Sequence, residues 1–197
     1  ANNSRRIIYA VAFDIAKQFK KYDKFYFSYK ADFRGRLYPV QQVFNPQATS
    51  NVKALMEFAD GVEPTEEGIY WLKVALANAR GYDKLTYDER VEYVDENLND
   101  ILRCSESPLE MTSFWTEADE PLMFLSGCKA LSDALEGKLV HYPVPLDATC
   151  SGIQIYSGLL MDEEGARAVN VINNDTGRPA DIYKEVADVV ERRLMSG

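Results

Sequence analysis

The spacing of apolar residues predicts that most of the chain is helical. Apolar side chains recur every three or four residues from Ser4 to about Lys21, through most of residues 51–136, and from Pro179 to Leu194. This spacing places them along one face of a helix. Ser4 is a candidate N-cap for the first of these helices.

Helix start and stop signals divide residues 51–136 into shorter helices. The start signals are Thr65, Thr86-x-x-Glu89, Ser107-Pro108-Leu109-Glu110 and Pro121, and the stop signals are Gly61, Gly81 and Gly137. We expect the helix that opens at Thr86 to run through Ile101, because its apolar residues keep the helical spacing that far.

Three stretches favour strands instead. Phe25–Tyr29 is aromatic, Leu37–Val40 resumes extended character after an interruption, and Leu139–Leu146 is a third extended stretch, broken by prolines. Gly35 in the interruption predicts a tight turn, and Asn45-Pro46-Gln47 predicts another. The expected fold class is therefore helix-rich α+β.

Charge and composition bear on two possibilities, a positively charged binding groove and a membrane span. The 197 residues carry a net charge of −9, yet the first 38 hold nine Lys and Arg against three Asp, or +6, which leaves −15 for the rest. A basic segment on an acidic body fits a locally positive groove, and it also fits a solvated N-terminal helix, which is the commoner case. No apolar run is long enough to span a membrane.

The sequence lacks the motifs of several kinds of binding site and catalytic mechanism. The three cysteines lie far apart without a C-x-x-C pair, and His141 is the single histidine, so we expect no structural zinc site and no histidine-based nucleophilic mechanism. Neither a G-x-x-x-x-G-K-[ST] loop nor a G-x-G-x-x-G fingerprint is present.

The segment Asp32-x-Arg34-Gly35-Arg36 with Tyr38 is a first candidate site. Arginines bind phosphate oxygens bidentately, and neighbouring aromatic rings stack on bases. A surface hairpin with solvated arginines is the alternative.

A second candidate is Asp147, an acid that ends an apolar run and precedes a turn of small residues. Ser151 and Gln154 have capping-box spacing, so a helix should begin near Gly152. A carboxylate beside a helix N-terminus can reach a metal, but it can equally be a turn or capping residue. Lys84, on a loop between helices, could reach a triphosphate or be an ordinary surface lysine.

Together, these stretches resemble the phage-type single-subunit RNA polymerases, a family that includes mitochondrial enzymes. The similar blocks keep the same order along residues 4–195, and the ordered set is far more specific than any one block. They are Phe25-Tyr26-Phe27, Asp32 to Tyr38, Phe44-Asn45-Pro46-Gln47, Glu67 to Lys73, Gly81-Tyr82-Asp83-Lys84, Ser107 to Glu110, Asp147 to Gln154 (similar to palm motif A), Gly165-x-Arg167-Ala168-Val169-Asn170 and Asp181-Ile182-Tyr183.

The resemblance implies part of a right-hand polymerase, with palm strands and helices close to the palm and fingers. Residues 1–46 would form a helix and the D-x-R-G-R hairpin, residues 47–137 a helical subdomain, and residues 138–197 the motif A strand with its following helices.

It also implies template-directed transfer of ribonucleotides to an RNA 3′ end by a two-metal mechanism. Asp147 would be one of two carboxylates that bind two Mg²⁺ ions, helped by the main-chain carbonyl of Ala148. Ser151 and Gly152 would shape the turn under the metals and border the bound nucleotide.

The resemblance also implies residues that bind nucleic acid and the incoming nucleotide. Arg36, with Arg34 and Tyr38 beside it, would hold the hybrid of DNA template and RNA product. Lys84 would contact the incoming ribonucleoside triphosphate. No membrane partner is implied.

The sequence departs from the family pattern in several places. Ala148 and Thr149 stand where Gly and Ser are usual, and Ile155 stands where His is usual. Motif B and motif C, which would supply the second carboxylate, are absent. The chain is therefore expected to be either a fragment or one subunit of a split polymerase whose partner carries those motifs.

Two other functions stay open on this sequence. One is a segment of a related template-dependent DNA polymerase, and the other is a scaffold subunit without catalysis. We expect the protein in the cytoplasm of a phage-infected cell or with the virion, in preference to mitochondria.

Overall fold

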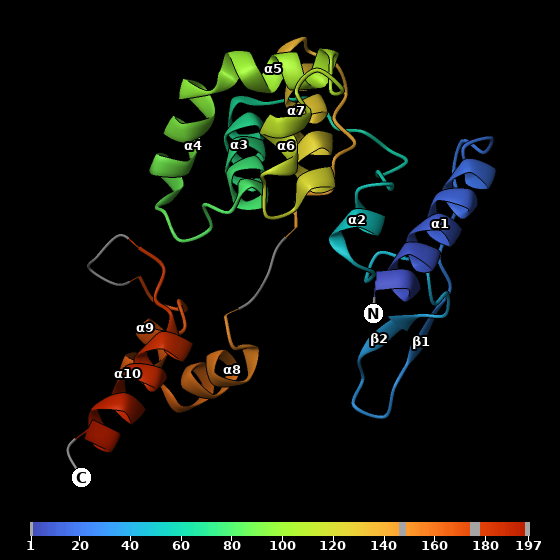
Figure 1. The fold of residues 1–197 in the computed structure, drawn as a ribbon. Helices are drawn as coiled ribbons and strands as arrows, with labels where there is room; N and C mark the ends of the chain where they lie inside the picture. The colour runs from blue at the N-terminus through green and yellow to red at the C-terminus, as the bar shows by residue number, and fades with distance from the viewer. Residues whose placement is uncertain (1, 146–148, 174–177, 196–197) are drawn as a thin grey trace. The chain divides into compact units, whose positions relative to one another are not determined.

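The structure is a computed structural model that describes residues 2–145, 149–173 and 178–195 (Figure 1). Its elements, in chain order, are α1 (Asn2–Phe19), β1 (Tyr29–Ala31), β2 (Leu37–Pro39), α2 (Ser50–Lys53), α3 (Glu66–Arg80), α4 (Tyr87–Glu96), α5 (Leu98–Glu106), α6 (Thr112–Thr116), α7 (Pro121–Leu135), α8 (Ser151–Leu160), α9 (Glu163–Ala168) and α10 (Ile182–Met195). This is the helix-rich α+β class that the sequence predicts. Among the described helices, none combines the length and the apolar character needed to cross a membrane.

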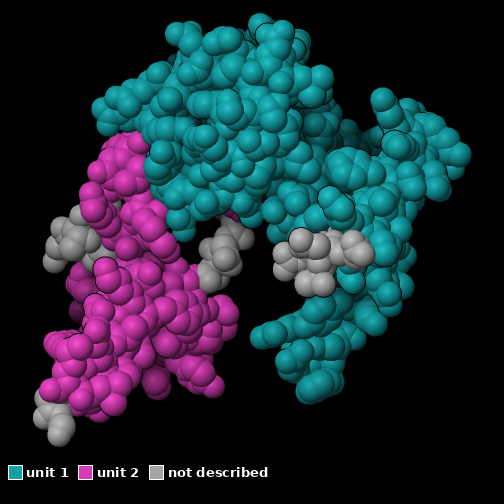
Figure 2. Space-filling model, in the orientation of Figure 1, with its two compact units in different colours: residues 1–83, 90–144 teal, residues 84–89, 145–197 magenta. Residues whose placement is uncertain are grey.

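The chain divides into two compact units, which Figure 2 shows in different colours. The first comprises residues 1–83 and 90–144, and the second comprises residues 84–89 and 145–197. The first unit therefore contains α1–α3, most of α4 and α5–α7, whereas the second contains the first turn of α4 together with α8, α9 and α10. The three-segment division expected from the sequence stays a prediction.

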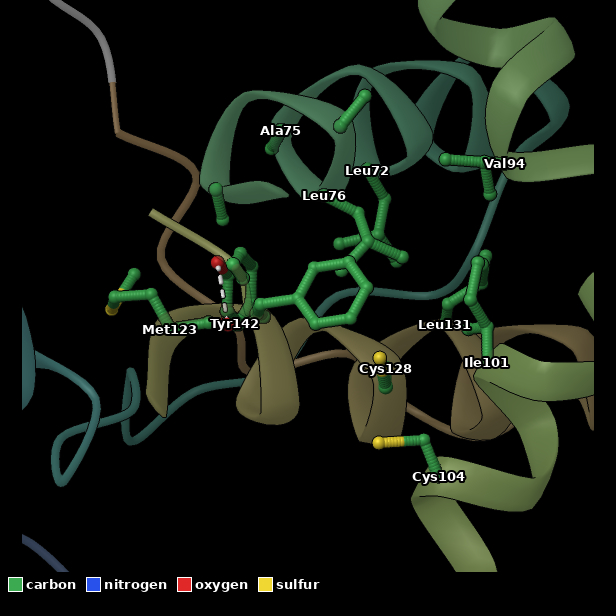
Figure 3. Packing of buried hydrophobic residues seen from close by; sticks show 14 of the residues in the cluster. Leu72, Ala75, Leu76, Val94, Ile101, Cys104, Met123, Cys128, Leu131 and Tyr142 are labelled. Atoms are coloured by element: carbon green, nitrogen blue, oxygen red, sulfur yellow. Dashed lines mark hydrogen bonds between the residues drawn. The ribbon is translucent and has the colours of Figure 1, made fainter. Parts of the chain in front are cut away.

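The main core of the first unit lies between α3, α5 and α7 (Figure 3). Leu76, Phe124 and Leu131 are fully buried there. A Cβ atom on Gly127 of α7 would lie 2.8 Å from Cδ1 of Leu76 on α3, so these helices approach closely only because residue 127 is glycine.

A smaller core joins α1 to the segments on either side of the hairpin, around the buried side chains of Ala12, Phe44 and Val52. Phe25 and Phe27 pack into it, with ring centroids 6.1 and 6.2 Å from that of Phe44. The strand expected over 25–29 is wrong except for its last residue, because these rings are used for packing and not for pairing with a neighbouring strand.

Helix ends set by local capping are confirmed. The Thr65 hydroxyl accepts a hydrogen bond from the Gly68 amide, and Gly81 ends α3 with a φ of +114°. The capping box at Thr86 and Glu89 forms in both directions, at 2.8 and 3.2 Å. Pro121 opens α7, as the sequence predicts.

Other sequence predictions of helix ends are wrong. The helix expected from Thr86 through Ile101 is interrupted at Asn97, whose side-chain amide donates to the Tyr93 carbonyl at 2.7 Å and competes with the helical pattern. Ser107 does not open a helix, because the Glu110 and Met111 amides bond its main-chain oxygen in a turn and α6 begins only at Thr112.

The remaining differences lie at the ends of the other predicted elements. Helix α1 already includes Asn2 and Asn3, so Ser4 lies inside it and is not the cap. α2 ends at Lys53, well before Gly61. Of the expected strand 139–146, the described part forms a single bridge between Val140 and Val62.

The second unit buries few side chains. Ser157, Ala166 and Val169 are buried there, and α10 buries none of its described residues. Large apolar side chains on α8 and α10 are exposed instead, for example Leu159 at 75% and Leu194 at 78%. With so little apolar packing, hydrogen bonds between segments carry more of the geometry of this unit.

Candidate functional site

The candidate basic site lies on the β1–β2 hairpin. The strands pair antiparallel, with Lys30 opposite Tyr38. Gly35 in the connecting turn has a φ of +78°, a left-handed conformation that favours glycine. The expected tight turn is thus confirmed.

One carboxylate organises this turn. Oδ1 of Asp32 accepts hydrogen bonds from the Arg34 amide at 2.9 Å and the Arg36 amide at 3.0 Å. Its Oδ2 accepts from Nε and Nη2 of Arg34 at 3.0 and 2.9 Å. Asp32 is therefore a structural acid, whose side chain shapes the loop that presents the arginines.

The two arginines are not equivalent. The Arg34 guanidinium is bound to Asp32, and its Nη2 also lies 3.4 Å from the Tyr38 hydroxyl. The exposed Arg36 side chain has no hydrogen bond or ion pair within the described ranges. Of the pair singled out from the sequence, Arg36 is the one with its donors available to a phosphate, while Arg34 and Tyr38 brace the turn.

The Asn-Pro-Gln turn supports the hairpin. The Asn45 side chain accepts from the Gln47 amide at 2.8 Å, and the Gln47 side-chain amide donates to the Leu37 carbonyl at 3.0 Å. Gln47 thus ties this turn to the start of β2. The sequence predicted the turn but not its contact with the hairpin, because that contact spans ten residues.

Asp147 and Ala148, the candidate metal ligands, lie outside the described residues. The residues that follow are described: Cys150 has a left-handed φ of +55°, and α8 begins at Ser151. Ser151 and Gly152 are thus in the first turn of a helix, as expected. The capping box is wrong, because the Gln154 side chain donates to the Val169 carbonyl at 2.8 Å and not to the backbone at the N-terminus of its own helix.

Lys84 lies in the second unit beside the segment that precedes α10. Its Nζ atom is 4.0 Å from Oδ2 of Asp181, and Nη2 of Arg178 is 3.2 Å from Oε1 of Glu89. Residues 84–89 and 178–181 are therefore joined by two ion pairs. The sequence had singled out Lys84 but predicted neither its ion pair with Asp181 nor the one between Arg178 and Glu89.

The described residues contain no group of three His, Cys, Asp or Glu side chains able to hold a metal ion. The expected ligands, a carboxylate and a main-chain carbonyl, are oxygen donors of the kind that Mg²⁺ prefers.

His141, the single histidine, makes a structural contact, since its Nδ1 atom lies 2.7 Å from the Phe58 carbonyl oxygen.

Comparison with known proteins decides the family. A sequence model described as DNA-dependent RNA polymerase matches residues 63–196, about two thirds of the chain. The chain belongs to the DNA-dependent RNA polymerase family. The matched range contains Lys84, Asp147 and all of the elements from α3 to α10.

Relatives of this polymerase chain come from phages and organelles. It is 39% identical to T7 RNA polymerase of Escherichia phage T7 over 199 aligned residues, which cover all of this chain and 22% of the relative. It is 35% identical to the mitochondrial DNA-directed RNA polymerase 1 of Arabidopsis thaliana (94% of this chain, 20% of the relative). It is 38% identical to the mitochondrial DNA-directed RNA polymerase of Neurospora crassa (95% and 13%).

The similarity to the phage T7 polymerase includes the hairpin, which precedes the range of the family model. The phage-type resemblance inferred from the ordered blocks is thereby confirmed. The chain spans between 13% and 22% of the length of these relatives.

The turn of the polymerase hairpin should depend on the charge of Asp32. Partial burial acts to raise the pKa of Asp32, but hydrogen bonds from Arg36 and Arg34 outweigh it and leave the pKa below the ordinary 3.8. The charged form therefore stabilises the turn above the unfolded pKa, and this contribution is lost as pH falls through the lower folded pKa. We expect the Arg36 amide resonance to titrate with a midpoint below 3.8.

This titration can be followed by two-dimensional NMR from about pH 6 to about pH 2. Asp32→Asn should abolish it, whereas Asp23→Asn, which changes an exposed aspartate outside the turn, should leave it intact. A midpoint at or above 3.8 would contradict the bonding described for Asp32.

Proposed function

We propose that this chain forms part of the catalytic centre of a DNA-dependent RNA polymerase, which adds ribonucleotides to an RNA 3′ end as directed by a DNA template. The observation that carries the proposal is the family match across residues 63–196, which includes the segment from Asp147 to Gln154. Polypeptide beyond these residues, in the same chain or in a second subunit, supplies motifs B and C.

In this proposal Asp147 and the carbonyl of Ala148 hold Mg²⁺, together with a second carboxylate from motif C. Bound Mg²⁺ supplies Lewis-acid activation of the 3′-hydroxyl and neutralises charge on the departing pyrophosphate. Ser151 and Gly152 border the nucleotide at the first turn of α8. The small side chain of Ser151 and the lack of one at Gly152 leave room for a triphosphate beside the helix N-terminus, where negative charge is favoured.

The hairpin binds the template–product hybrid through Arg36. Its side chain is exposed and makes no hydrogen bond among the described residues, and its charge acts on Asp32 only from a distance, whereas Arg34 is held by Asp32. A planar guanidinium suits phosphate oxygens. Residues 1–38, which include the hairpin, carry a net charge of +6. Negatively charged nucleic acid is therefore attracted to this segment more strongly than to the acidic remainder of the chain.

Lys84 contacts the triphosphate of the incoming nucleotide. Its side chain is 78% exposed and lies beside the carboxylate of Asp181, so an anionic phosphate can replace that carboxylate as its partner.

The cell compartment that we propose is the cytoplasm of a phage-infected host, with RNA polymerases of phages T7 and T3 among the relatives.

Replacing Asp147 tests the proposal directly. In the complete polymerase assembly, Asp147→Asn should lower the rate of ribonucleotide addition by at least about a thousandfold, because it removes a metal-binding charge at the reacting centre. Binding of template DNA should change little. The measurement is extension of a labelled RNA primer on a DNA template with Mg²⁺ and either ribonucleotides or deoxyribonucleotides.

Asp100→Asn provides the matched control, because Asp100 lies on α5 in an exposed ion pair with Arg103. Normal extension by Asp147→Asn would refute the metal-binding role. Equal use of deoxyribonucleotides would favour the DNA polymerase alternative, and an assembly inactive with either nucleotide would favour a scaffold.

Arg36→Gln should weaken binding of an RNA–DNA hybrid by the complete assembly. Loss of one phosphate contact should reduce the slope of log affinity against log salt by about one. Arg103→Gln on α5 is the matched control, because Arg103 is similarly exposed but lies outside the hairpin. An unchanged salt slope for Arg36→Gln, measured by fluorescence anisotropy, would show that Arg36 does not contact the hybrid.

A further inference from the structure

Arg90, on α4, is the one charged residue that is buried in the described part of the chain, with 4% of its surface exposed. Its Nη1 atom donates to the side-chain oxygen of Asn78 at 2.9 Å, and its Nη2 atom donates to the main-chain carbonyl of Asp83 at 2.7 Å. Asn78 belongs to the last turn of α3. A single guanidinium therefore joins α4 both to the end of α3 and to the loop that follows α3.

The stability of the core does not account for a buried guanidinium at this point. Removing a charge from water costs free energy, and an apolar side chain of similar volume is often as stable or more stable in such a place. Val94, about one turn after Arg90, is fully buried and already anchors α4 in the main core. The burial of Arg90 is therefore better explained by the geometry of the loop that it binds.

The first residues of this loop are held by contacts that do not involve Arg90. Gly81 has a left-handed φ of +114°, and the amides of Gly81 and Tyr82 both bond the Ala77 carbonyl, at 3.2 and 3.0 Å. The ring of Tyr82 packs against that of Tyr93, with the centroids 4.4 Å apart. The direction of the chain is thus fixed as far as residue 82.

Arg90 fixes the next step of the chain. The Asp83 carbonyl that accepts its hydrogen bond belongs to the peptide group whose nitrogen is that of Lys84. Because a peptide group is planar, a bond to its carbonyl oxygen also sets the direction in which the following residue leaves. A side chain held on a packed helix thereby orients the backbone of Lys84, the proposed triphosphate ligand.

The ion pairs on the segment beyond this peptide contribute less fixed geometry. The pair of Lys84 with Asp181 and the pair of Arg178 with Glu89 both lie between exposed or half-exposed side chains. Such pairs contribute little free energy and exchange readily with water and salt. The nearly complete burial of Arg90 protects its hydrogen bonds from this competition.

We propose that Arg90 is a positioning residue for the incoming nucleotide, which directs Lys84 to the triphosphate by holding the peptide group between Asp83 and Lys84. This role rests on the function proposed above for Lys84. Arg90 itself touches neither the nucleotide nor a metal ion.

Arg90→Met tests this role through nucleotide binding, without catalysis. Methionine keeps an extended apolar side chain but removes the donors, so the peptide group before Lys84 loses its anchor. The complete polymerase assembly is bound to a DNA template and an RNA primer with a 3′-deoxy end, which prevents nucleotide addition. We expect the Kd of the templated ribonucleoside triphosphate to rise about tenfold, measured by the fluorescence of 2-aminopurine in the template.

The matching ribonucleoside 5′-monophosphate provides an internal reference in the same assay. It lacks the phosphates that Lys84 would contact, so its affinity, measured by competition, should not change in Arg90→Met. A merely structural role of Arg90 would weaken the binding of both nucleotides.

A double substitution shows whether Arg90 acts through Lys84. If it does, Arg90→Met combined with Lys84→Met should weaken triphosphate binding no more than Lys84→Met alone, since the first change has nothing left to misplace. Losses that add in the double variant would overturn the proposal.

Arg80→Met is the matched control. The Arg80 side chain is 15% exposed and also donates to a main-chain carbonyl, that of Phe114 on α6, at 2.6 Å. It should leave the triphosphate Kd unchanged. If Arg90→Met does not fold, Asn78→Ala preserves α3 and removes the oxygen that orients the guanidinium, and it should raise the triphosphate Kd about threefold. An unchanged Kd in Asn78→Ala would then overturn the proposal.

The outcomes separate this role from the proposed function. A higher triphosphate Kd in Arg90→Met, with normal monophosphate affinity and a normal Arg80→Met, supports the positioning role. Equal losses for both nucleotides, or the same loss in Arg80→Met, mean that Arg90 only stabilises the fold and overturn it. Weak triphosphate binding by Lys84→Met but normal binding by Arg90→Met overturns the positioning role alone. Normal binding by Lys84→Met refutes the proposed role of Lys84, and the positioning role with it.

Discussion

The close approach of α3 and α7 is the constraint on which the first unit depends. Gly127 lets Leu76 lie against the backbone of α7, and Phe124 and Leu131 fill the surrounding core. Any side chain at residue 127 would separate the helices, and the interior of a protein accommodates such a change poorly. The helices that end near Gly81 and begin at Pro121 are fixed by this packing, so the first unit is organised mainly by apolar contacts.

The candidate site depends on polar contacts instead. At the hairpin, the carboxylate of Asp32 accepts hydrogen bonds from two main-chain amides and from the Arg34 guanidinium. The Arg36 guanidinium is left available for a phosphate. In the second unit, where few side chains are buried, the Asn170 amide and the Gln154 side chain hold loops that packing does not. A carboxylate or an amide with several simultaneous partners specifies one geometry, since each lost partner leaves a polar group unsatisfied.

The sequence predicts the features that depend on neighbouring residues. The ends of α3 and the box at Thr86 follow from short-range capping, and the arginine turn follows from Gly35. The strand expected at 25–29 fails because its rings pack against Phe44, about twenty residues away. Likewise, the sequence identified both arginines but not which of them Asp32 binds, and it did not predict the contact of Asn170 with Thr149, 21 residues apart. Such contacts form only when distant segments meet, which no local pattern encodes.

The central claim is that this chain contributes a metal-binding carboxylate to RNA synthesis, and local oxidative cleavage tests it most directly. Fe²⁺ that replaces Mg²⁺ in the complete assembly generates hydroxyl radicals with ascorbate and peroxide, which cut polypeptide close to the metal. The account predicts main-chain cleavage around residues 147–149, lost on Asp147→Asn and suppressed by excess Mg²⁺. An assembly that extends RNA with Mg²⁺ but shows no cleavage near residue 147 would contradict it.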